Sequence, residues 1–391
     1  MKVCHVVYSF YEKDSRVRMY AEALAGRGDH VDVVALKWQG MAEVEVLNGV
    51  HVHRIQPRIV NEQSKATFLY RLLKFFINSS AYLARRTLNG AGPFDLIHVH
   101  SVPDFEVFAA LIPKLAGSKI ILDIHDIVPE FYQSKFDVRR DSFVFKGLLF
   151  MEKASTAFAD HVIIANHLWD KIITERSVKR ENCSVFLNYP VPAFFQSYPR
   201  TRQDAKVRMI YPGSLNLHQG VDLAVKAFDL IKAQAPEAEM YIYGDGPARD
   251  ALWNLVADMN IESRVFLRDA LPLEEIIPIV AQADIGIVPK RAESFGNTAF
   301  STKIFEFMAL NVPAIVSKTA IDSHYFNDSI VRFFEPGDVE SLAAAMLELI
   351  KDRQQRVILA QNAAAFIQEN AWVHKGKEYL DLVDGLVRRS N

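Results

Sequence analysis

The chain has 391 residues, of which 50% are hydrophobic and 24% charged, and its formal net charge is −2. This composition excludes a disordered chain and fits two to three globular domains with large cores. Because the net charge is slightly negative and basic residues are not interleaved along a continuous surface, we do not expect nucleic-acid binding. The two cysteines, Cys4 and Cys183, stand far apart and outside any metal-binding pattern, as expected in a reducing compartment.

The N-terminal run MKVCHVVYSF lacks the long apolar region of a signal peptide, and no uncharged apolar run reaches spanning length. We therefore expect a cytoplasmic protein. Between Glu62 and Asp95 the sequence has five basic residues and no acid, and the spacing over 65–86 predicts a basic amphipathic helix. Its expected apolar stripe contains Phe68, Leu69, Leu72, Leu73, Phe76 and Ile77, with Arg71, Lys74, Asn78 and Arg85 opposite. Two interpretations stay open: peripheral contact with the inner face of a membrane, or an ordinary helix packed on a sheet.

Short runs rich in Val and Ile alternate with helical patterns, which is typical of parallel sheets covered by helices on both faces. The expected strands are 2–8, 31–37, 49–55, 95–100, 119–125, 160–166 and 184–187, then 207–214, 239–246, 264–269, 284–289, 314–317 and 329–338. The proline-rich segment 188–204 interrupts this alternation. We predict an α/β protein with two Rossmann-like doubly wound parallel-sheet domains, 1–195 and 196–371. A final helix over about 372–391 would cross back to the first domain.

Ligands of open parallel sheets bind at the carboxyl ends of the strands. In the second half, four loops should meet there: 213–220, 244–247, 289–291 and the start of the segment 291–317. That last segment should begin a helix after Thr302 and end it at Asn311 and Pro313. The exposed N–H groups and dipole of such a helix start favour an anion such as a diphosphate.

The residue types in these loops suit a phosphorylated sugar ligand. Gly213 and Gly244 would let the backbone approach a ligand closely. Three cations, Lys290, Arg291 and Lys303, could neutralise an anion, and Glu306 could accept hydrogen bonds from a pair of sugar hydroxyls.

These residues give the chain a resemblance to glycosyltransferase family 4, the retaining nucleotide-sugar transferases of the GT-B fold. The resemblance spans nearly the whole chain and rests on YPGSLNLHQGVDLAVKAF, YIYGDGPARDAL, the ADIGIVP run and STKIFEFMALNVPAIVS. It implies two domains that face a central cleft, with the donor, expected to be UDP-linked, on the second and a hydroxyl acceptor on the first. It also implies that Glu306 holds the ribose hydroxyls, that backbone N–H groups around Gly296 to Phe300 face the diphosphate and sugar, and that the Gly213 loop lies under the phosphates.

The chain departs from the family pattern at two places. The cations that many members carry in the first loop are replaced by Ser214 and Gln219, so Arg291 and Lys303 are the nearest substitutes for contacting the diphosphate. The family's paired glutamates usually stand eight residues apart, which would place the first at Thr298. Either Glu293 keeps the sugar-binding, catalytic role from a longer loop, or Asn297 and Thr298 supply those contacts.

In the first half, the loop LDIHDIVPE carries the informative residues. Resemblance to the family's HD-containing loop suggests that His125 donates to negative charge beside the donor, although a satisfied interior histidine is the alternative. Asp126 is expected to support the following turn, with an acceptor-binding role left open. Arg16 could contact the donor phosphate or an acceptor, or could be a solvated residue at a helix start.

The sequence contains no Asp-x-Asp and no His/Asp set at metal-ligand spacing, so we expect neither a metal nor another cofactor. Front-face displacement, with the leaving phosphate helping to deprotonate the acceptor, is the mechanism that the resemblance implies. The acceptor could be a glycan, a lipid-linked saccharide or a natural product, and polysaccharide biosynthesis is one expected context. Two other functions stay open on the same fold: a nucleotide-sugar epimerase, and a catalytically silent nucleotide-sugar-binding module.

Overall fold

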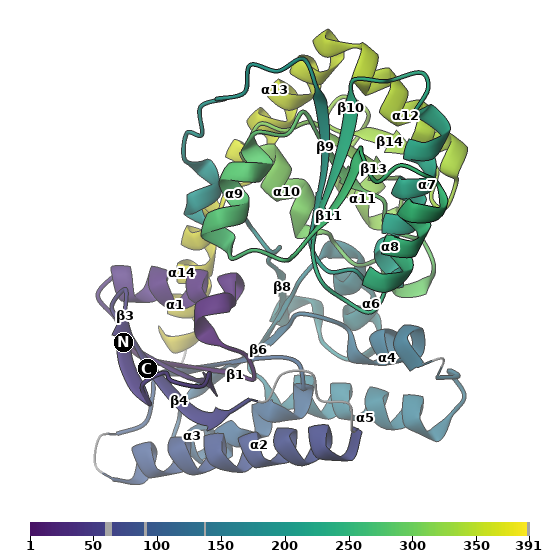
Figure 1. Ribbon diagram of the computed structural model, residues 1–391. Coiled ribbons are helices and arrows are strands. Elements are labelled where there is room, and N and C mark those ends of the chain that lie inside the picture. The colour runs from purple at the N-terminus through teal and green to yellow at the C-terminus, as the bar shows by residue number, and fades with distance from the viewer. Residues whose placement is uncertain (59–64, 90–91, 137, 389–391) are drawn as a thin grey trace. The chain divides into compact units, whose positions relative to one another are not determined.

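The computed structural model describes residues 1–58, 65–89, 92–136 and 138–388, which form two compact units (Figure 1). The first unit contains Met1–Asn188 and Trp372–Asn391, and the second contains Tyr189–Ala371. The division thus falls before the expected boundary at 195, because the segment after Asn188 packs with the second unit. There the Tyr189 ring stacks on Phe305, with centroids 6.1 Å apart. Both units are α/β with doubly wound, largely parallel sheets, so the predicted fold class is confirmed.

In the described part of the first unit the strands form one sheet with the order β3-β4-β2-β1-β5-β6-β7-β8. Their bounds are β1 Lys2–Val7, β2 His30–Lys37, β3 Val44–Leu47, β4 Val50–Pro57, β5 Leu96–His100, β6 Lys119–Ile124, β7 His161–Ile164 and β8 Cys183–Val185. All neighbours pair in parallel except β3 and β4. Sequence analysis missed β3 because most of its side chains are exposed, which leaves no buried apolar pattern to detect.

Helices cover both faces of the first sheet. They are α1 Ser15–Gly26, α2 Lys65–Leu88, α3 Leu111–Leu115, α4 Val128–Phe136, α5 Phe143–Phe158, α6 His167–Arg176 and α14 Trp372–Arg388, with the 3₁₀ segment η2 Asp104–Ala110 before α3. Asp14 caps α1 by accepting from the Val17 N–H at 3.2 Å, which satisfies one otherwise unpaired donor. From the C-terminal end of the chain, α14 returns to this core and packs Tyr379 against Tyr20, with ring centroids 4.4 Å apart.

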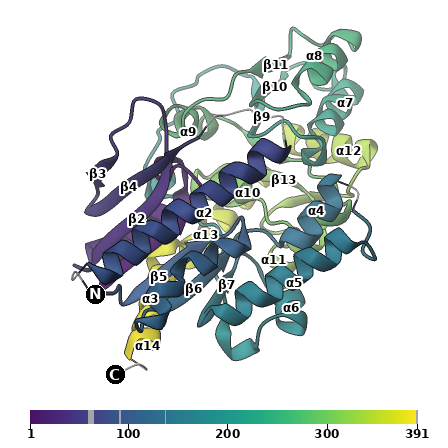
Figure 2. The same ribbon diagram turned by 90° about the horizontal axis from the view of Figure 1, so that it is seen from below.

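The amphipathic helix predicted over 65–86 is α2, and its predicted apolar stripe is right only in part, since Leu72 is buried as expected. The residues that face the sheet are Leu72, Phe75, Ser79 and Leu83, while Leu69, Leu73 and Ile77 are exposed. The helix has apolar residues on more than one face, so hydrophobic spacing alone could not say which face is covered. Figure 2 shows α2, α3 and α5 in front of the sheet. Among the helices that the structure describes, none combines the length and apolar character needed to cross a bilayer.

The second unit contains a parallel sheet with the order β11-β10-β9-β12-β13-β14 in its described residues. Its strands are β9 Val207–Pro212, β10 Ala238–Tyr243, β11 Val265–Arg268, β12 Ile285–Val288, β13 Ala314–Ser317 and β14 Arg332–Phe334. Its helices are α7 Val221–Ile231, α8 Arg249–Asp258, α9 Leu273–Ala281, α10 Thr302–Ala309, α11 Ala320–Tyr325, α12 Val339–Lys351 and α13 Arg353–Glu369, with 3₁₀ segments η5 Leu217–Gln219 and η6 Ser294–Asn297.

The strand order reverses between β9 and β12, which is where a ligand is expected in a doubly wound sheet. The helix α10 follows β12 and lies close to it because Gly286 has no side chain: a Cβ there would stand 2.6 Å from the Phe307 ring. As predicted, α10 begins at Thr302, and Asn311 beyond its end adopts a left-handed conformation with φ of 59°. The helix start that we predicted to face an anion therefore lies beside the reversal point.

Candidate functional site

Two glycines bring the loops after β9 and β10 into direct contact. The Gly213 N–H donates to the Tyr243 carbonyl at 2.8 Å, and the Leu215 N–H donates to the Asp245 carbonyl at 2.9 Å. A Cβ on Gly244 would lie 1.9 Å from the Gly213 carbonyl oxygen, and Gly213 itself has a φ of 145°. These two predicted site residues therefore allow the loops to approach each other, at the carboxyl edge of the sheet.

A third glycine joins the loops after β9 and β12. Gly220 has a φ of 68°, and a Cβ on it would lie 1.9 Å from the Pro289 carbonyl oxygen. The Arg291 guanidinium spans the same junction, donating to the two carboxylate oxygens of Asp222 at 2.8 and 2.9 Å and to the Leu217 carbonyl at 3.0 Å. Arg291, which we predicted to contact a diphosphate, is thus already paired, and such a contact would compete with Asp222.

The α10 residues Lys303 and Glu306 lie on successive turns of the helix and are both partly exposed. Lys303 runs alongside Gly213: its Cε lies 2.3 Å from the place that a Cβ on Gly213 would take, and its Nζ lies 5.2 Å from the Tyr211 ring centroid. Burial lowers the pKa of Lys303, an effect that Glu306 opposes, and burial raises the pKa of Glu306, an effect that Lys303 opposes. In the described residues Lys303 has no carboxylate within ion-pair distance, so its charge is available to a ligand.

The first-loop residues Ser214 and Gln219 both contact the hydroxyl of Tyr211, and the Lys303 ammonium lies over the ring of the same tyrosine. The Tyr211 hydroxyl donates to the Ser214 carbonyl at 2.8 Å, and Gln219 Oε1 lies 3.3 Å from the same hydroxyl. Burial raises the pKa of Tyr211, so the phenol stays neutral and can act as a donor. Ser214 is exposed and Gln219 is half-buried.

Lys290 is buried and serves the structure of the loop. Its ammonium lies 2.8 Å from an Asp322 carboxylate oxygen and donates to the Ala299 carbonyl at 2.8 Å. Burial lowers the pKa of Lys290 and raises that of Asp322, while each charge opposes the shift of the other. The pair therefore ties the loop before α10 to the start of α11, and a second predicted cation is engaged inside the protein.

The segment from Glu293 to Thr298 forms the short helix η6 and its flanks. A Cβ on Gly296 would stand 2.3 Å from the Arg291 carbonyl oxygen, so only glycine fits there. Asn297 Oδ1 accepts from the Ala320 N–H at 2.8 Å, and the Thr298 hydroxyl lies 3.4 Å from the Phe295 carbonyl. The Glu293 side chain is exposed and forms no ion pair within the described residues.

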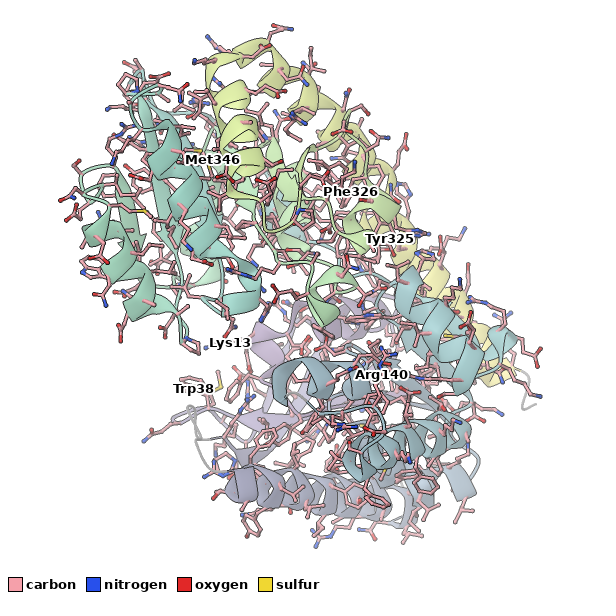
Figure 3. All side chains as sticks on the ribbon, turned by 90° about the vertical axis from the view of Figure 1, so that its right-hand side faces the viewer. Lys13, Trp38, Arg140, Tyr325, Phe326 and Met346 are labelled. Atoms are coloured by element: carbon pink, nitrogen blue, oxygen red, sulfur yellow. The ribbon has the colours of Figure 1, made fainter. Side chains whose placement is uncertain are left out.

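Aromatic side chains pack behind this loop. Phe300 contacts Phe305 with centroids 4.8 Å apart, Tyr325 at 5.4 Å and Phe326 at 6.1 Å. Tyr325 and Phe326, labelled in Figure 3, come from α11 and the residue after it. The rings fix the chain just before α10. In the predicted run of donors from Gly296 to Phe300, the N–H groups of Gly296, Thr298 and Ala299 donate to the Glu293 and Phe295 carbonyls and are already engaged within the loop.

In the first unit, three side chains meet at the carboxylate of Asp123, near the end of β6. The Arg16 guanidinium donates to both carboxylate oxygens, at 2.7 and 2.8 Å, while His100 Nδ1 and His125 Nε2 lie 3.1 and 3.2 Å from Oδ2. Arg16 holds the pKa of the Asp123 carboxyl well below its usual range, although burial opposes the shift. Arg16 also donates to Phe186 O and Asn188 Oδ1, so it is a buried residue and not a solvated helix start.

The ionised Asp123 determines how the neighbouring imidazoles are protonated. Because the carboxylate only accepts, we assign His100 Nδ1 and His125 Nε2 as its donors; the two nitrogens lie 3.3 Å apart and share the Oδ2 acceptor. His100 Nε2 is then an acceptor for His5 Nδ1, which lies 3.0 Å away. Burial lowers the pKa values of His5 and His100, and the two rings therefore stay neutral in this chain of hydrogen bonds. His125 is the partly exposed member.

Two groups of side chains here have the spacing of metal ligands, which sequence analysis did not foresee. They are His5, His98 and His100, and His100, Asp123 and His125, with the ligand atoms of each group within 4.8 Å of one another. They come from different strands, so no short sequence pattern reveals them. The His98 and His100 rings stack at 4.2 Å, and the buried Arg16 charge contacts Asp123, and both features oppose a bound cation. Asp126, next to His125, is half-buried, and burial raises its pKa.

Sequence reasoning missed the residues that support the predicted ones. Asp123 stands two places before His125 in the segment LDIHDIVPE. Its position at the end of a predicted strand, where ligands of parallel sheets bind, could have identified it as a site residue. Asp222 and Gly220 also stood inside the quoted YPGSLNLHQGVDL segment. The pairing of Asp222 with Arg291 joins residues far apart in the chain, so only the fold reveals it.

Residues 197–366 match the family model described as Glycosyl transferases group 1, and residues 14–188 match that of a Glycosyl transferase 4-like domain. The sulfoquinovosyl transferase of Arabidopsis thaliana is 24% identical over 304 residues, which are 71% of this chain and 54% of that protein. The amylovoran biosynthesis glycosyltransferase AmsK of Erwinia amylovora is 24% identical over 205 residues, 52% of this chain and 50% of that one. The chain spans about half the length of these curated relatives.

Solved structures resemble the chain over nearly its full length. A sucrose-phosphate synthase from Thermosynechococcus elongatus superposes with a TM-score of 0.78 at 19% identity, covering 99% of both chains. Anabaena HepE, solved in complex with UDP and glucose, gives a TM-score of 0.74 at 16% identity, covering 99% of this chain and 100% of that one. At such identities the likeness shows the fold alone.

Replacing Asp123 by Asn should lower the free energy of unfolding by about 3–5 kcal/mol, because the buried Arg16 loses its counter-charge. The matched control is Asp141→Asn, since that carboxylate pairs with Arg139 in solvent and should matter by less than about 1 kcal/mol. Urea denaturation measures the free energy of unfolding of both variants. Equal losses in the two variants would contradict the central role that we give to Asp123.

Proposed function

Because the chain belongs to the group 1 glycosyltransferases and has their GT-B fold, we propose that it transfers a hexose-type sugar from a nucleotide diphosphate donor to a hydroxyl acceptor. The donor is UDP-linked, the anomeric configuration is retained, and no metal takes part. The first unit binds the acceptor and the second binds the donor. The observation that carries this proposal is the placement of Lys303 and Glu306 on α10, beside Gly213 at the reversal of the sheet.

The diphosphate contacts fall to Lys303 and the backbone, since Arg291 and Lys290 are paired with Asp222 and Asp322. Lys303 runs along Gly213 and so has its ammonium beside the main chain of the first loop, where it can meet a phosphate. N–H groups at the start of α10 add the positive end of a helix dipole. Together these groups stabilise the negative charge that builds up on the leaving diphosphate.

The donor ribose is assigned to Glu306, one turn into α10. Its carboxylate can accept hydrogen bonds from two neighbouring hydroxyls; burial raises the pKa of Glu306, and the positive charge of the adjacent Lys303 opposes that shift. The crystallised complex of Anabaena HepE with UDP and glucose supports a uridine donor for the fold. Of the two options for the sugar, Glu293 is favoured, because Asn297 already accepts from the Ala320 N–H.

In the first unit, His125 and Asp126 are assigned to the acceptor side and the transferred sugar. Arg16, first considered as a phosphate ligand, uses its guanidinium on Asp123, Phe186 and Asn188, so we assign it to positioning. Asp123 holds His125 Nε2 as a donor and so fixes the ring. The same Arg16 contact argues for a reaction without a metal, since Asp123 is already neutralised.

In the proposed reaction the bond between the sugar C1 and the diphosphate oxygen breaks as the acceptor oxygen forms a bond to C1 on the same face. The acceptor proton passes to the leaving phosphate oxygen, so charge and atoms balance. Lys303 and the start of α10 supply the stabilisation that a metal would otherwise give.

A membrane contact is proposed for the outer face of α2, α3 and α5. Across these helices the single acid is Glu152, which is 1% exposed and pairs with Arg176. The exposed apolar residues are Phe68, Leu69, Tyr70, Leu73, Ile77, Leu88, Leu111, Ile112, Leu115, Phe143, Val144 and Phe150. Exposed cations including Lys74 and Lys146 accompany them. Apolar side chains with cations and without exposed acids suit a surface of anionic lipids, and the protein would then act at the cytoplasmic face of the membrane.

The transfer proposal is tested by incubating the protein with UDP- and GDP-linked sugars and following nucleotide release with and without EDTA. Glu306→Ala should weaken UDP binding by roughly ten- to a hundredfold, because a hydrogen bond to a charged group contributes about 1.5–3 kcal/mol. Calorimetry measures the affinity, and Glu275→Ala, an exposed glutamate on α9, serves as the control. Unchanged UDP affinity in Glu306→Ala, or no release from any donor, would refute the proposal; an epimer formed without acceptor would indicate an epimerase.

The choice between Glu293 and Thr298 is decided by comparing UDP with a UDP-sugar. Glu293→Gln should reduce the preference for the UDP-sugar by about tenfold and leave UDP binding unchanged, because only the sugar contacts are lost. Thr298→Val removes one hydroxyl at equal size and should change neither the affinity for UDP nor the preference for the UDP-sugar. If Thr298→Val alone reduces the preference, the sugar contact belongs to the Asn297 and Thr298 pair.

The membrane proposal predicts flotation of the protein with vesicles of phosphatidylcholine and phosphatidylglycerol, and little flotation with phosphatidylcholine alone. Leu73→Glu combined with Ile77→Glu should abolish flotation, because both side chains are exposed on α2 and the change adds negative charge. The control changes Leu230 and Trp253, exposed apolar residues of the second unit, to Glu. Equal flotation of both double variants would exclude the outer face of α2, α3 and α5 as the contact.

A further inference from the structure

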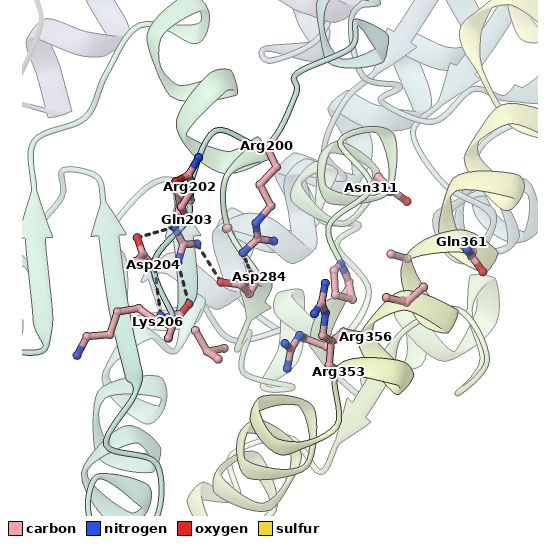
Figure 4. A pocket seen from close by; sticks show the side chains of 16 residues that line it. Arg200, Arg202, Gln203, Asp204, Lys206, Asp284, Asn311, Arg353, Arg356 and Gln361 are labelled. Carbon is pink, nitrogen blue, oxygen red and sulfur yellow. Dashed lines mark hydrogen bonds and ion pairs between the residues drawn. The ribbon is translucent and has the colours of Figure 1, made fainter.

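A cavity of about 580 Å³ lies in the second unit between the segment 200–206 and the helix α13. Figure 4 shows arginines from both sides converging on it. Val207, Asp284 and Pro313 line it, and these residues stand at or before the starts of β9, β12 and β13. The cavity is therefore at the amino edge of the sheet, whereas Gly213 and the start of α10 are at the carboxyl edge. A strand of six residues separates the two edges by roughly 20 Å.

Two of the cavity's arginines are neutralised by nearby carboxylates. Arg200 and Arg202 both donate to Asp284, the latter at 2.9 Å, and Arg202 also donates to Asp204 at 2.6 Å. The Asp284 carboxylate in turn accepts from the Arg208 N–H at 2.9 Å, which fixes it at the start of the sheet. These contacts form a rigid polar wall on one side of the cavity.

The other arginines, Arg353 and Arg356, come from the first turn of α13 and form no ion pair with a carboxylate in the part of the chain that the structure describes. Arg356 donates to the carbonyls of Leu349 and Ile350, the latter at 2.9 Å, and so is held in place. Burial lowers the pKa of Arg356, and the like charges of Arg200 and Arg353 lower it further, against the attraction of Asp284 and Asp352. Together with Lys206, the lining has an excess of three positive charges.

We infer that this cavity is a second anion site, which binds a small molecule carrying a phosphate group. The guanidinium groups of Arg353 and Arg356 can each present paired N–H donors to phosphate oxygens. Gln203, Asn311 and Gln361 also line the cavity and can exchange hydrogen bonds with hydroxyl groups. The volume falls in the range of small-molecule sites, so a sugar phosphate fits better than a macromolecule. This inference does not depend on the donor proposed above.

The test titrates the full-length protein with inorganic phosphate and, separately, with glucose 6-phosphate, by calorimetry at low ionic strength in the presence of saturating UDP. UDP fills the donor site, so binding that persists belongs to another place. Arg353→Gln combined with Arg356→Gln should weaken binding by roughly tenfold or more, since each contact is charge-assisted. Arg332→Gln removes one partly exposed arginine charge of the same unit, paired with Glu348 outside the cavity, and should leave binding unchanged.

Because Arg356 also holds the end of α12, the single variant Arg353→Gln and a thermal melt accompany the double variant. Weaker binding in a folded Arg353→Gln supports the site, and tighter binding of glucose 6-phosphate than of phosphate identifies a sugar phosphate as the ligand. Loss of all binding when UDP is present, or an equal effect of Arg332→Gln, overturns the inference. Loss of phosphate binding in the presence of UDP would not contradict the proposed sugar transfer. Conversely, absence of nucleotide release from every donor would not contradict this anion site.

Discussion

The close approach of three backbone segments at the carboxyl edge of the second sheet decides where every other group of the candidate site can stand. Gly244 admits the Gly213 carbonyl, and Gly220 admits the Pro289 carbonyl, each at a distance that no Cβ would tolerate. The loops after β9, β10 and β12 therefore form one continuous surface. Beside it, the lack of a side chain at Gly213 leaves the space that the Lys303 side chain occupies.

Once those loops are joined, most of the nearby charge is used to hold them. Arg291 is bound by Asp222 and Lys290 by Asp322, so two cations that could have met a ligand stabilise the loops around it. A buried ion pair contributes little net stability, but breaking it leaves an uncompensated charge, and the loop geometry is therefore strongly constrained. Lys303 differs because it contacts a backbone and an aromatic ring instead of a carboxylate, which leaves its charge for a ligand.

The sequence predicted the architecture well because its signals are local. Val- and Ile-rich runs identified the buried strands, and Asn311 with Pro313 identified the end of α10. What it could not predict depends on pairing across the fold. The predicted stripe of α2 is right at Leu72 but wrong at Leu69, Leu73 and Ile77, because the helix has apolar residues on more than one face, and β3 carries no burial pattern. The partners of Arg16 and Arg291 were equally invisible, since Asp123 and Asp222 lie far from them in the chain.

The Asp123 cluster shows why the residue types of a site are easier to predict than their protonation. His125 was identified from its loop, yet its hydrogen-bonding role follows from Asp123, which must accept and therefore makes Nε2 the donor. Asp123 can remain ionised inside the protein because Arg16 binds both of its oxygens. The orientation of the partly exposed His125 ring thus depends on Asp123 at the end of β6, and the ionisation of Asp123 depends on Arg16 on α1. Because the Arg16 guanidinium is already bonded to Asp123, Phe186 and Asn188, a substitution at Arg16 would act on His125 through Asp123.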